Sequence, residues 1–120
     1  MAYVDGFLLS VPKKNLDAYR RLARIAGRIW RKHGALDYKE CVADDLKVKR
    51  GCGISFSRVA KVKSNEAVIF SYIVYKSRAH RDRVNAKVMQ DPRLAAAMKG
   101  PMPFDVKSMS HGGFKVLVSS

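Results

Sequence analysis

The stretch that most constrains the fold is Glu66–Tyr75, because its apolar residues occupy both faces of an extended chain. Between Ala67 and Tyr75 only Ser71 interrupts the apolar run. The run is too short for a membrane-spanning helix, which needs about 20 residues. Apolar residues at odd and even positions alike are typical of an internal strand that is covered on both sides. We therefore expect helices on one face of a sheet and something else, such as a second subunit, on the other.

Alternating apolar residues indicate three further strands. They are expected at residues 2–11, 36–43 and 114–118. Charges within residues 36–43 suit a half-buried strand at the edge of the sheet.

Two helices are expected between these strands. The first starts within residues 13–15, where Asn15 is a candidate cap, and ends at Gly34, since glycine readily takes the left-handed conformation that closes a helix. The second is capped by Ser77 and ended by Pro92.

The order strand, helix, strand, strand, helix, strand is the split βαβ plan. We predict one α+β domain over residues 1–120, with a ferredoxin-like βαββαβ antiparallel sheet and helices on one face. Residues 46–65 are expected to form a long connection that covers one end of the sheet, and residues 93–99 a helical turn or two.

The chain is strongly basic, with 24 Lys and Arg against 10 Asp and Glu and a net charge of +14. Such a charge attracts polyanions without specificity. Cys41 and Cys52 are too few for a disulfide framework, and no signal-peptide apolar stretch follows Met1. We expect a soluble cytoplasmic protein, with no membrane attachment, whose thiols are reduced and serve packing. Neither a cofactor nor a metal is predicted.

The first predicted helix is amphipathic. Its basic half carries Arg20, Arg21, Arg24, Arg28, Arg31 and Lys32. This half could bind RNA or another polyanion, but a solvated face is the simpler interpretation because no aromatic residues are interleaved with the cations. On the apolar half, Trp30 and His33 lie one turn apart. They could line a pocket, and core packing of Trp30 and a helix-dipole interaction of His33 explain them as well.

The second predicted helix is unusually polar for one that covers a small sheet. Its weak apolar stripe of Val84, Val88 and Met89 is interrupted on the same face by Arg81 and Asn85. Either these two groups are held at the helix edge by ion pairs and backbone, or they face a ligand.

Asp5 shares the face of the large apolar residues of the first strand, so it lies either at a strand end near water or against an interior cavity. Together these observations define a set of candidate ligand-binding residues: Asp5, Trp30, His33, Arg81, Asn85 and Asp105. A carboxylate and an imidazole near an arginine could transfer protons on a bound acidic or carbonyl compound. No catalytic residue is assigned.

Five segments together resemble the YbaA-like family of proteins of unknown function. They are AYVDGF (2–7), YKECVADD (38–45), YKSRAHRDRVNAKVM (75–89), MPFD (102–105) and GGF (112–114). The resemblance spans essentially the whole chain. It implies membership of the dimeric α+β barrel superfamily, in which two ferredoxin-like sheets pair into a homodimer. The partner sheet would then cover the second face of Glu66–Tyr75.

The same resemblance implies a ligand cleft between the sheet and the helices, but no reaction. Relatives in the wider superfamily include small-molecule monooxygenases and haem-degrading enzymes. The haem-degrading pattern has an asparagine on the first strand and a tryptophan and a histidine in the second half. This chain has Asp5 in the first position and its only tryptophan, Trp30, in the first helix, which argues against haem.

Three functions are therefore carried forward. The first is a homodimeric small-ligand-binding protein or cofactor-independent enzyme. The second is RNA or polyanion binding through the basic face of the first helix, and the third is a structural or regulatory dimer without catalysis.

Overall fold

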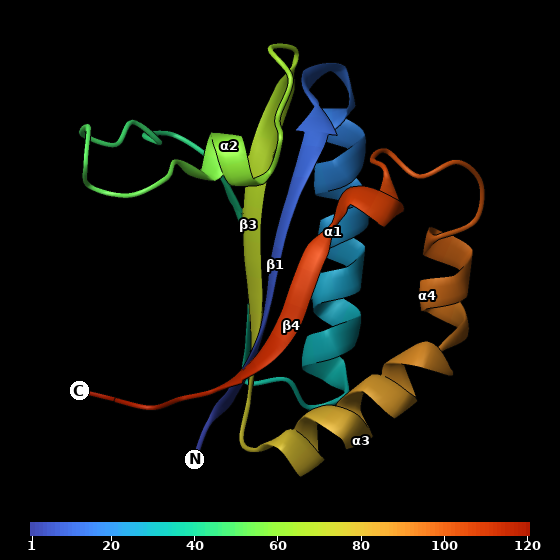
Figure 1. Ribbon diagram of the computed structural model, residues 1–120. Coiled ribbons are helices and arrows are strands. Elements are labelled where there is room, and N and C mark those ends of the chain that lie inside the picture. The colour runs from blue at the N-terminus through green and yellow to red at the C-terminus, as the bar shows by residue number, and fades with distance from the viewer.

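The computed structural model describes residues 1–120 and contains a four-stranded antiparallel sheet of order β2-β3-β1-β4. The strands are β1 (Tyr3–Pro12), β2 (Asp37–Val42), β3 (Glu66–Tyr75) and β4 (Ser110–Lys115). The helices are α1 (Leu16–Lys32), α2 (Phe56–Val59), α3 (Arg78–Met89) and α4 (Pro92–Ala97), with short 3-10 turns at Lys13–Asn15 and Val106–Ser108. The predicted α+β fold is confirmed. In Figure 1 the sheet is seen nearly edge-on, with α1, α3 and α4 on one side and α2 on the other.

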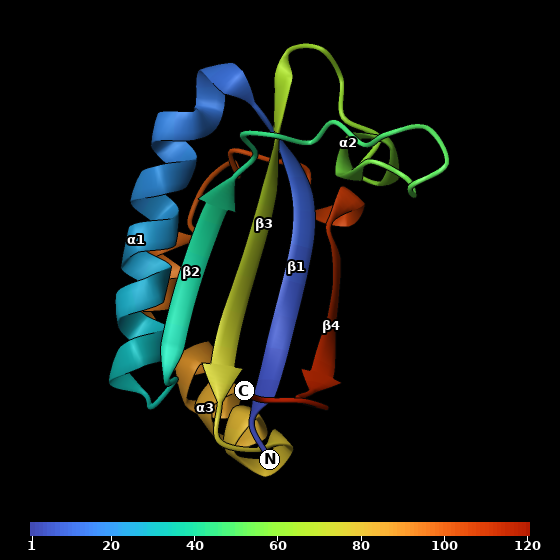
Figure 2. The same ribbon diagram turned by 90° about the vertical axis from the view of Figure 1, so that its left-hand side faces the viewer.

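The strand β3 is internal, as its apolar faces predict. It pairs with β1 on one side and with β2 on the other. Ile69 and Ile73 are buried beneath the helices, whereas Phe70 and Tyr72 point to the opposite face. Figure 2 looks onto that opposite face, where the strands lie side by side and α2 is near one end of the sheet.

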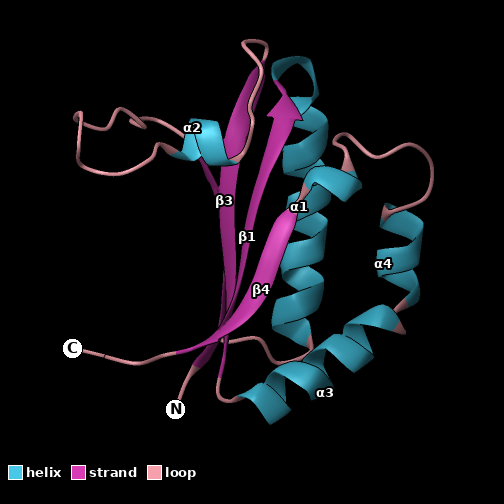
Figure 3. Cartoon of the chain, viewed as in Figure 1, coloured by secondary structure: helices cyan, strands magenta, loops and turns pink.

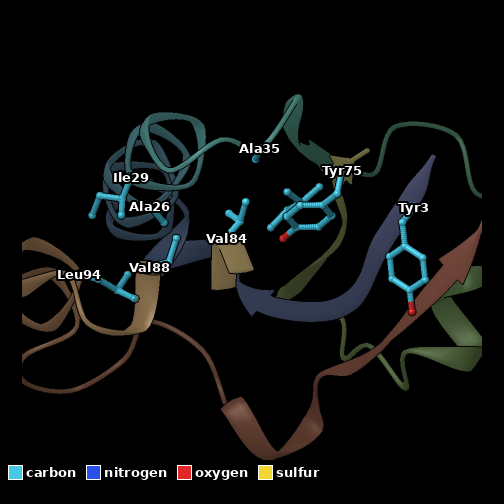
Figure 4. Close-up of a cluster of buried hydrophobic side chains, with 9 residues drawn as sticks. Tyr3, Ala26, Ile29, Ala35, Tyr75, Val84, Val88 and Leu94 are labelled. Carbon is cyan, nitrogen blue, oxygen red and sulfur yellow. The ribbon is translucent and has the colours of Figure 1, made fainter. Parts of the chain in front are cut away.

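Two clusters of buried side chains join the helices to the sheet. One gathers Ile29 of α1, Val84 and Val88 of α3 and Tyr75 of β3, as Figure 4 shows in close-up. The other, toward the opposite end of the sheet, is built around Leu9, Val11, Tyr19 and Ile69. The partly buried Phe7 touches both clusters. The hydrophobic core is therefore divided into two clusters. The helix-facing side of the sheet between them carries side chains that belong to neither cluster.

The helix α3 buries only Val84 and Val88. Ser77 caps it, accepting a hydrogen bond from the backbone N–H of His80, as predicted. Pro92 does not simply end this helix. The helix stops at Met89, and Pro92 opens α4 behind a cap made by Asp91, which suits proline because the first helical turn needs no N–H from it.

Two other predictions are corrected. Asn15 does not cap α1 with its side chain, which instead donates to the carbonyl of Pro103. The last strand is Ser110–Lys115 rather than 114–118, because pairing with β1 recruits the glycine pair 112–113, whose own strand propensity is low. The long connection contains α2, where Phe56 packs near Phe70 with ring centroids 6.2 Å apart.

Figure 3 shows α2 as the one helix within the long loop between β2 and β3. It covers only one end of the sheet face that the other helices leave open (Figure 1). On that open face, Phe70 is 46% exposed and Phe114 is 62% exposed. No helix in the chain is long and apolar enough to span a membrane.

Candidate functional site

A cavity of about 470 Å³ lies between the helix-facing side of the sheet and the segments that cover it. Its walls come from α1, α3 and α4 and from the connection that leads to β4. Residues of both core clusters line it, among them Leu9, Tyr19, Ile73 and Tyr75. The cavity therefore occupies the division between the two halves of the core.

The strand register places two rows of side chains across the floor of this cavity. Pairing aligns Glu40 with Ser71, Ser71 with Phe7, and Phe7 with His111. Because side chains at facing positions of paired strands share a face of the sheet, these four residues cross the floor from edge to edge. The adjacent row runs through Tyr38, Ile73, Asp5 and Gly113.

Asp5 and Arg81 form a buried ion pair at the α3 end of the cavity. Nη1 of Arg81 donates to Oδ1 of Asp5 at 2.7 Å, and Nε donates to Oδ1 of Asp82 at 2.8 Å. The guanidinium also lies over the ring of Tyr3, with Cζ 5.0 Å from the ring centroid. Gly113 leaves room for this arrangement, since a Cβ there would lie 2.2 Å from the Tyr3 hydroxyl.

Burial dominates the electrostatics of Asp5, which is only 6% exposed. Loss of solvent raises the pKa of the Asp5 carboxyl above its ordinary value, and the charge of Arg81 together with hydrogen bonds from Asn85 and Arg81 opposes part of that rise. The ionisation of Asp5 is therefore governed by burial and by its protein neighbours rather than by water.

Asn85 connects α3 with α1 and β3. Its Oδ1 accepts a hydrogen bond from Nε1 of Trp30 at 3.0 Å and another from the hydroxyl of Tyr75 at 3.1 Å. Burial and the nearby carboxylate of Asp5 raise the pKa of Tyr75, which keeps this phenol a donor. The structure thus brings together four of the six candidate residues: Asp5, Trp30, Arg81 and Asn85.

His33 lies outside the cavity. Its position as the residue that ends α1 turns it toward the α3–α4 junction, where Nε2 is 2.7 Å from Oδ2 of Asp91. Hydrogen bonds from Arg93 and His33 lower the pKa of Asp91, so this carboxylate is held charged. The imidazole is thereby used to join α1 to α4, and the sequence prediction that places it in the shared site is corrected.

Asp105 also lies outside the cavity. It is exposed and caps the 3-10 turn Val106–Ser108, accepting a hydrogen bond from the backbone N–H of Lys107 at 3.1 Å. Its neighbour Phe104 lines the cavity in its place, in contact with Tyr19 at a ring-centroid distance of 5.6 Å. Asp105 is therefore removed from the candidate set because capping accounts for it.

Two polar groups in the cavity were missed by the sequence prediction. Glu40 accepts hydrogen bonds from the hydroxyls of Tyr19 and Tyr38, each at 2.7 Å. Burial, and then the charge of Glu40, raise the pKa of both tyrosines, so both stay protonated donors. In the sequence, strand alternation puts Glu40 on the same face as the apolar Val42. This placement was the signal that could have identified Glu40 as a residue facing the helices.

The second missed group is His111 on β4. Its ring stacks on Phe7 with centroids 5.9 Å apart, and it lines the cavity from an exposed position at the edge of the sheet. His111 was missed because the sequence pattern predicts that the last strand begins at residue 114, whereas β4 begins at Ser110. The imidazole facing the cavity is thus His111 rather than His33.

The rest of the cavity wall is largely apolar and flexible. It includes Met89, Met98, Met102 and Met109 together with Leu94 and Phe104. Methionine side chains adapt to irregular ligands and contact aromatic rings favourably. No three His, Cys, Asp or Glu side chains gather as a metal site. A carboxylate, an imidazole and an amide around apolar walls are the usual ingredients of a small-molecule site.

Fold and cavity define a ferredoxin-like α+β protein with a cleft between its sheet and helices. The model of a family described as protein of unknown function (DUF1428) matches residues 2–106. The chain is 42% identical over 118 residues to the uncharacterized protein YbaA of Escherichia coli K12, with 98% of each chain covered, and the YbaA protein of Shigella flexneri matches equally well. The protein belongs to this family.

A solved structure supports the fold. The structure of Rv0793 from Mycobacterium tuberculosis aligns with a TM-score of 0.60 over 100% of this chain and 99% of that one, at 12% identity. At this identity the likeness concerns the fold alone.

Removing Arg81 tests the buried pair. We predict that Arg81→Met lowers the free energy of unfolding by roughly 3 kcal/mol at pH 8, because the carboxylate of Asp5 is left buried without its cation. Without Arg81 the pKa of Asp5 rises further in the folded state, so the folded protein binds more protons than the unfolded chain, and stability falls as pH rises above the unfolded value of 3.8. Urea unfolding at pH 4 and pH 8 measures both effects.

The control is Asp82→Asn, which removes the exposed partner of the same guanidinium. A small loss that is similar at both pH values is expected for it. Equal losses for Arg81→Met at the two pH values would show that Asp5 does not depend on Arg81.

Proposed function

We propose that the protein is a cytoplasmic homodimer that holds a small organic ligand in the cavity between its sheet and helices. The observation that carries this is the cavity of about 470 Å³ with the Asp5, Arg81 and Asn85 cluster at one end and apolar walls elsewhere. A few oriented polar groups within an apolar cleft are what fix and recognise a drug-sized molecule. Cavities of this kind are larger than packing defects in small domains.

Chemistry on the bound ligand is an extension of this proposal. His111 places an imidazole on the floor of the cavity, whereas the carboxyl group of Asp5 is held by Arg81. An imidazole is the side chain that most often exchanges protons with a substrate near neutral pH. The site is suited to moving a proton on a carbonyl compound through His111.

Filling the cavity tests the binding site. We expect N-phenyl-1-naphthylamine, an uncharged dye whose emission rises in apolar surroundings, to bind at one site per chain. Ser71→Leu, which replaces a hydroxymethyl with an isobutyl side chain on the floor of the cavity, should weaken that binding by about tenfold or more, because the added volume displaces the dye. Fluorescence titration gives the affinities.

The matched control is Ser64→Leu, the same substitution at an exposed position in the turn before β3. It should leave dye binding unchanged. Equal effects of the two substitutions, or no dye binding by the native chain, would overturn the cavity as a binding site.

The open face of the sheet supports the homodimer. Phe70 and Phe114 are exposed there, and Tyr72 and Leu8 lie on the same face by register. Monomeric proteins rarely expose aromatic and aliphatic side chains together across one sheet face, and such patches mark contacts with other chains. Pairing two copies through this face would shield the apolar side chains on the second face of β3 from water.

A charged residue on this face should break the dimer. We expect the native chain to sediment as a dimer at micromolar concentration and Phe70→Lys to sediment as a monomer, because an unpaired cation would be buried at the interface. Arg83→Ala on the solvent side of α3 serves as the control. A native chain that sediments as a monomer at all concentrations would contradict the dimer.

Polyanion binding is a second candidate, favoured by a groove of about 910 Å³ between α1 and β2. Arg20, Arg31 and Lys39 at its sides are occupied by contacts within the chain. Three other cations in the groove make no ion pair: Arg24, Arg28 and Lys32. They recur every four residues and so follow one line along α1.

Salt dependence tests this second function. A labelled single-stranded RNA 20-mer should bind at 50 mM salt, with the logarithm of affinity falling as the logarithm of salt rises. Replacing Arg24, Arg28 and Lys32 together with Gln should reduce the magnitude of that slope by about two, since three phosphate contacts are lost.

The control replaces Lys47, Lys49 and Arg50 with Gln, which removes the same charge from the loop before α2. An equal reduction by both triple variants would indicate attraction to net charge alone. No binding at 50 mM salt would exclude the function.

A further inference from the structure

The charge of the cavity lining is opposite in sign to that of the protein. The whole chain carries +14. Among the residues that line the cavity only Asp5, Glu40 and Arg81 have charged side chains at neutral pH, with His111 counted as neutral. Two carboxylates and one guanidinium leave a net charge of −1 on the lining. The basic character of the protein therefore stays on its outer surface.

Arg81 does not offer its charge to a ligand. Its guanidinium donates to Asp5 and to Asp82, and its Cζ lies over the ring of Tyr3. An incoming carboxylate would have to displace Asp5 from the guanidinium. That exchange would leave the Asp5 carboxylate buried without a cation, next to a second negative charge, which is strongly unfavourable.

Glu40 keeps its negative charge toward the cavity. Both of its carboxyl oxygens accept hydrogen bonds from phenols, Oε1 from Tyr19 and Oε2 from Tyr38. Both oxygens therefore act as acceptors, the role that a carboxylate fills. The phenols are neutral, and no Lys, Arg or His side chain is within ion-pair distance of Glu40.

The groups left to meet a ligand are uncharged. The floor presents the Ser71 hydroxyl and the His111 imidazole on either side of the Phe7 ring. Methionine side chains and Phe104 form the opposite wall. Such a surface stacks on an apolar or aromatic body and hydrogen-bonds a hydroxyl or carbonyl substituent.

We propose that this cavity selects an uncharged, mainly apolar organic molecule with a hydroxyl or carbonyl group, and discriminates against organic anions. The inference rests on the proposed ligand-binding function and narrows it. On the sequence alone, both acidic and carbonyl compounds are candidate ligands. The charge of the cavity favours the carbonyl compounds. The groove beside α1 shares Glu40, Tyr19 and Tyr38 with the cavity but adds six cations that the cavity lacks, so an anion is drawn to the groove rather than to the cavity.

The test compares two probes that share one ring system, 2-naphthylmethanol and 2-naphthoate, at pH 7.5. Competition with N-phenyl-1-naphthylamine is measured in 0.5 M salt, where attraction to the basic surface is screened to within about 4–5 Å. The native chain should bind the alcohol about tenfold or more tightly than the carboxylate. Glu40→Gln should narrow that ratio several-fold, while Asp17→Asn, which removes an equal charge from the exposed start of α1, should leave it unchanged.

The outcomes separate the two proposals. Equal or tighter binding of 2-naphthoate by the native chain overturns the charge selection but leaves the cavity as a binding site. A ratio that responds equally to Glu40→Gln and Asp17→Asn also overturns it, since the selection would then come from net charge. Failure of both probes and of the dye to bind overturns the ligand-binding function itself.

Discussion

The ion pair between Asp5 and Arg81 is the interaction on which the arrangement of the site depends. It joins the central strand β1 to α3 across the interior, at 2.7 Å. Removing one member of a buried ion pair leaves the other charge buried without a partner. This destabilises the fold far more than the loss of an exposed ion pair. The pair accounts for the polarity of α3, because the helix face that would otherwise be apolar carries Arg81 and Asn85 toward the sheet. Polar contacts hold this helix where Val84 and Val88 alone would bury little surface.

Much of the fold could be predicted from local patterns. The two apolar faces of Glu66–Tyr75 place this strand inside the sheet, and the one-sided periodicity of the first helix identifies the face that packs on it. Asp5, Arg81 and Asn85 stood out as polar residues at positions where apolar ones are expected. Each of these signals lies within one helix or strand, so it can be recognised without knowing which other segments pack against that element.

The remainder of the site depends on register between distant segments, which local patterns do not contain. Glu40 faces the cavity because β2 pairs with β3 so that Glu40 lies opposite Ser71. His111 faces it because β1 draws the glycine-containing segment of β4 into the sheet. His33 shows the converse: its place on the apolar half of the first helix suggested a pocket, but the end of that helix faces Asp91. Helical periodicity does not predict the direction of a side chain at a helix end, because the chain leaves the helix there.

The two binding sites proposed for the protein differ in charge. The outer groove beside α1 is rich in unpaired cations, while the cavity holds its one cation in an internal pair. The most direct test of this account is a crystal structure of the protein purified from cells without added ligand. The account predicts density for an uncharged organic molecule over Phe7, with the Asp5 and Arg81 side chains still paired. A cavity closed by the chain's own methionines, or an anion bound directly to Arg81 with Asp5 displaced, would contradict it.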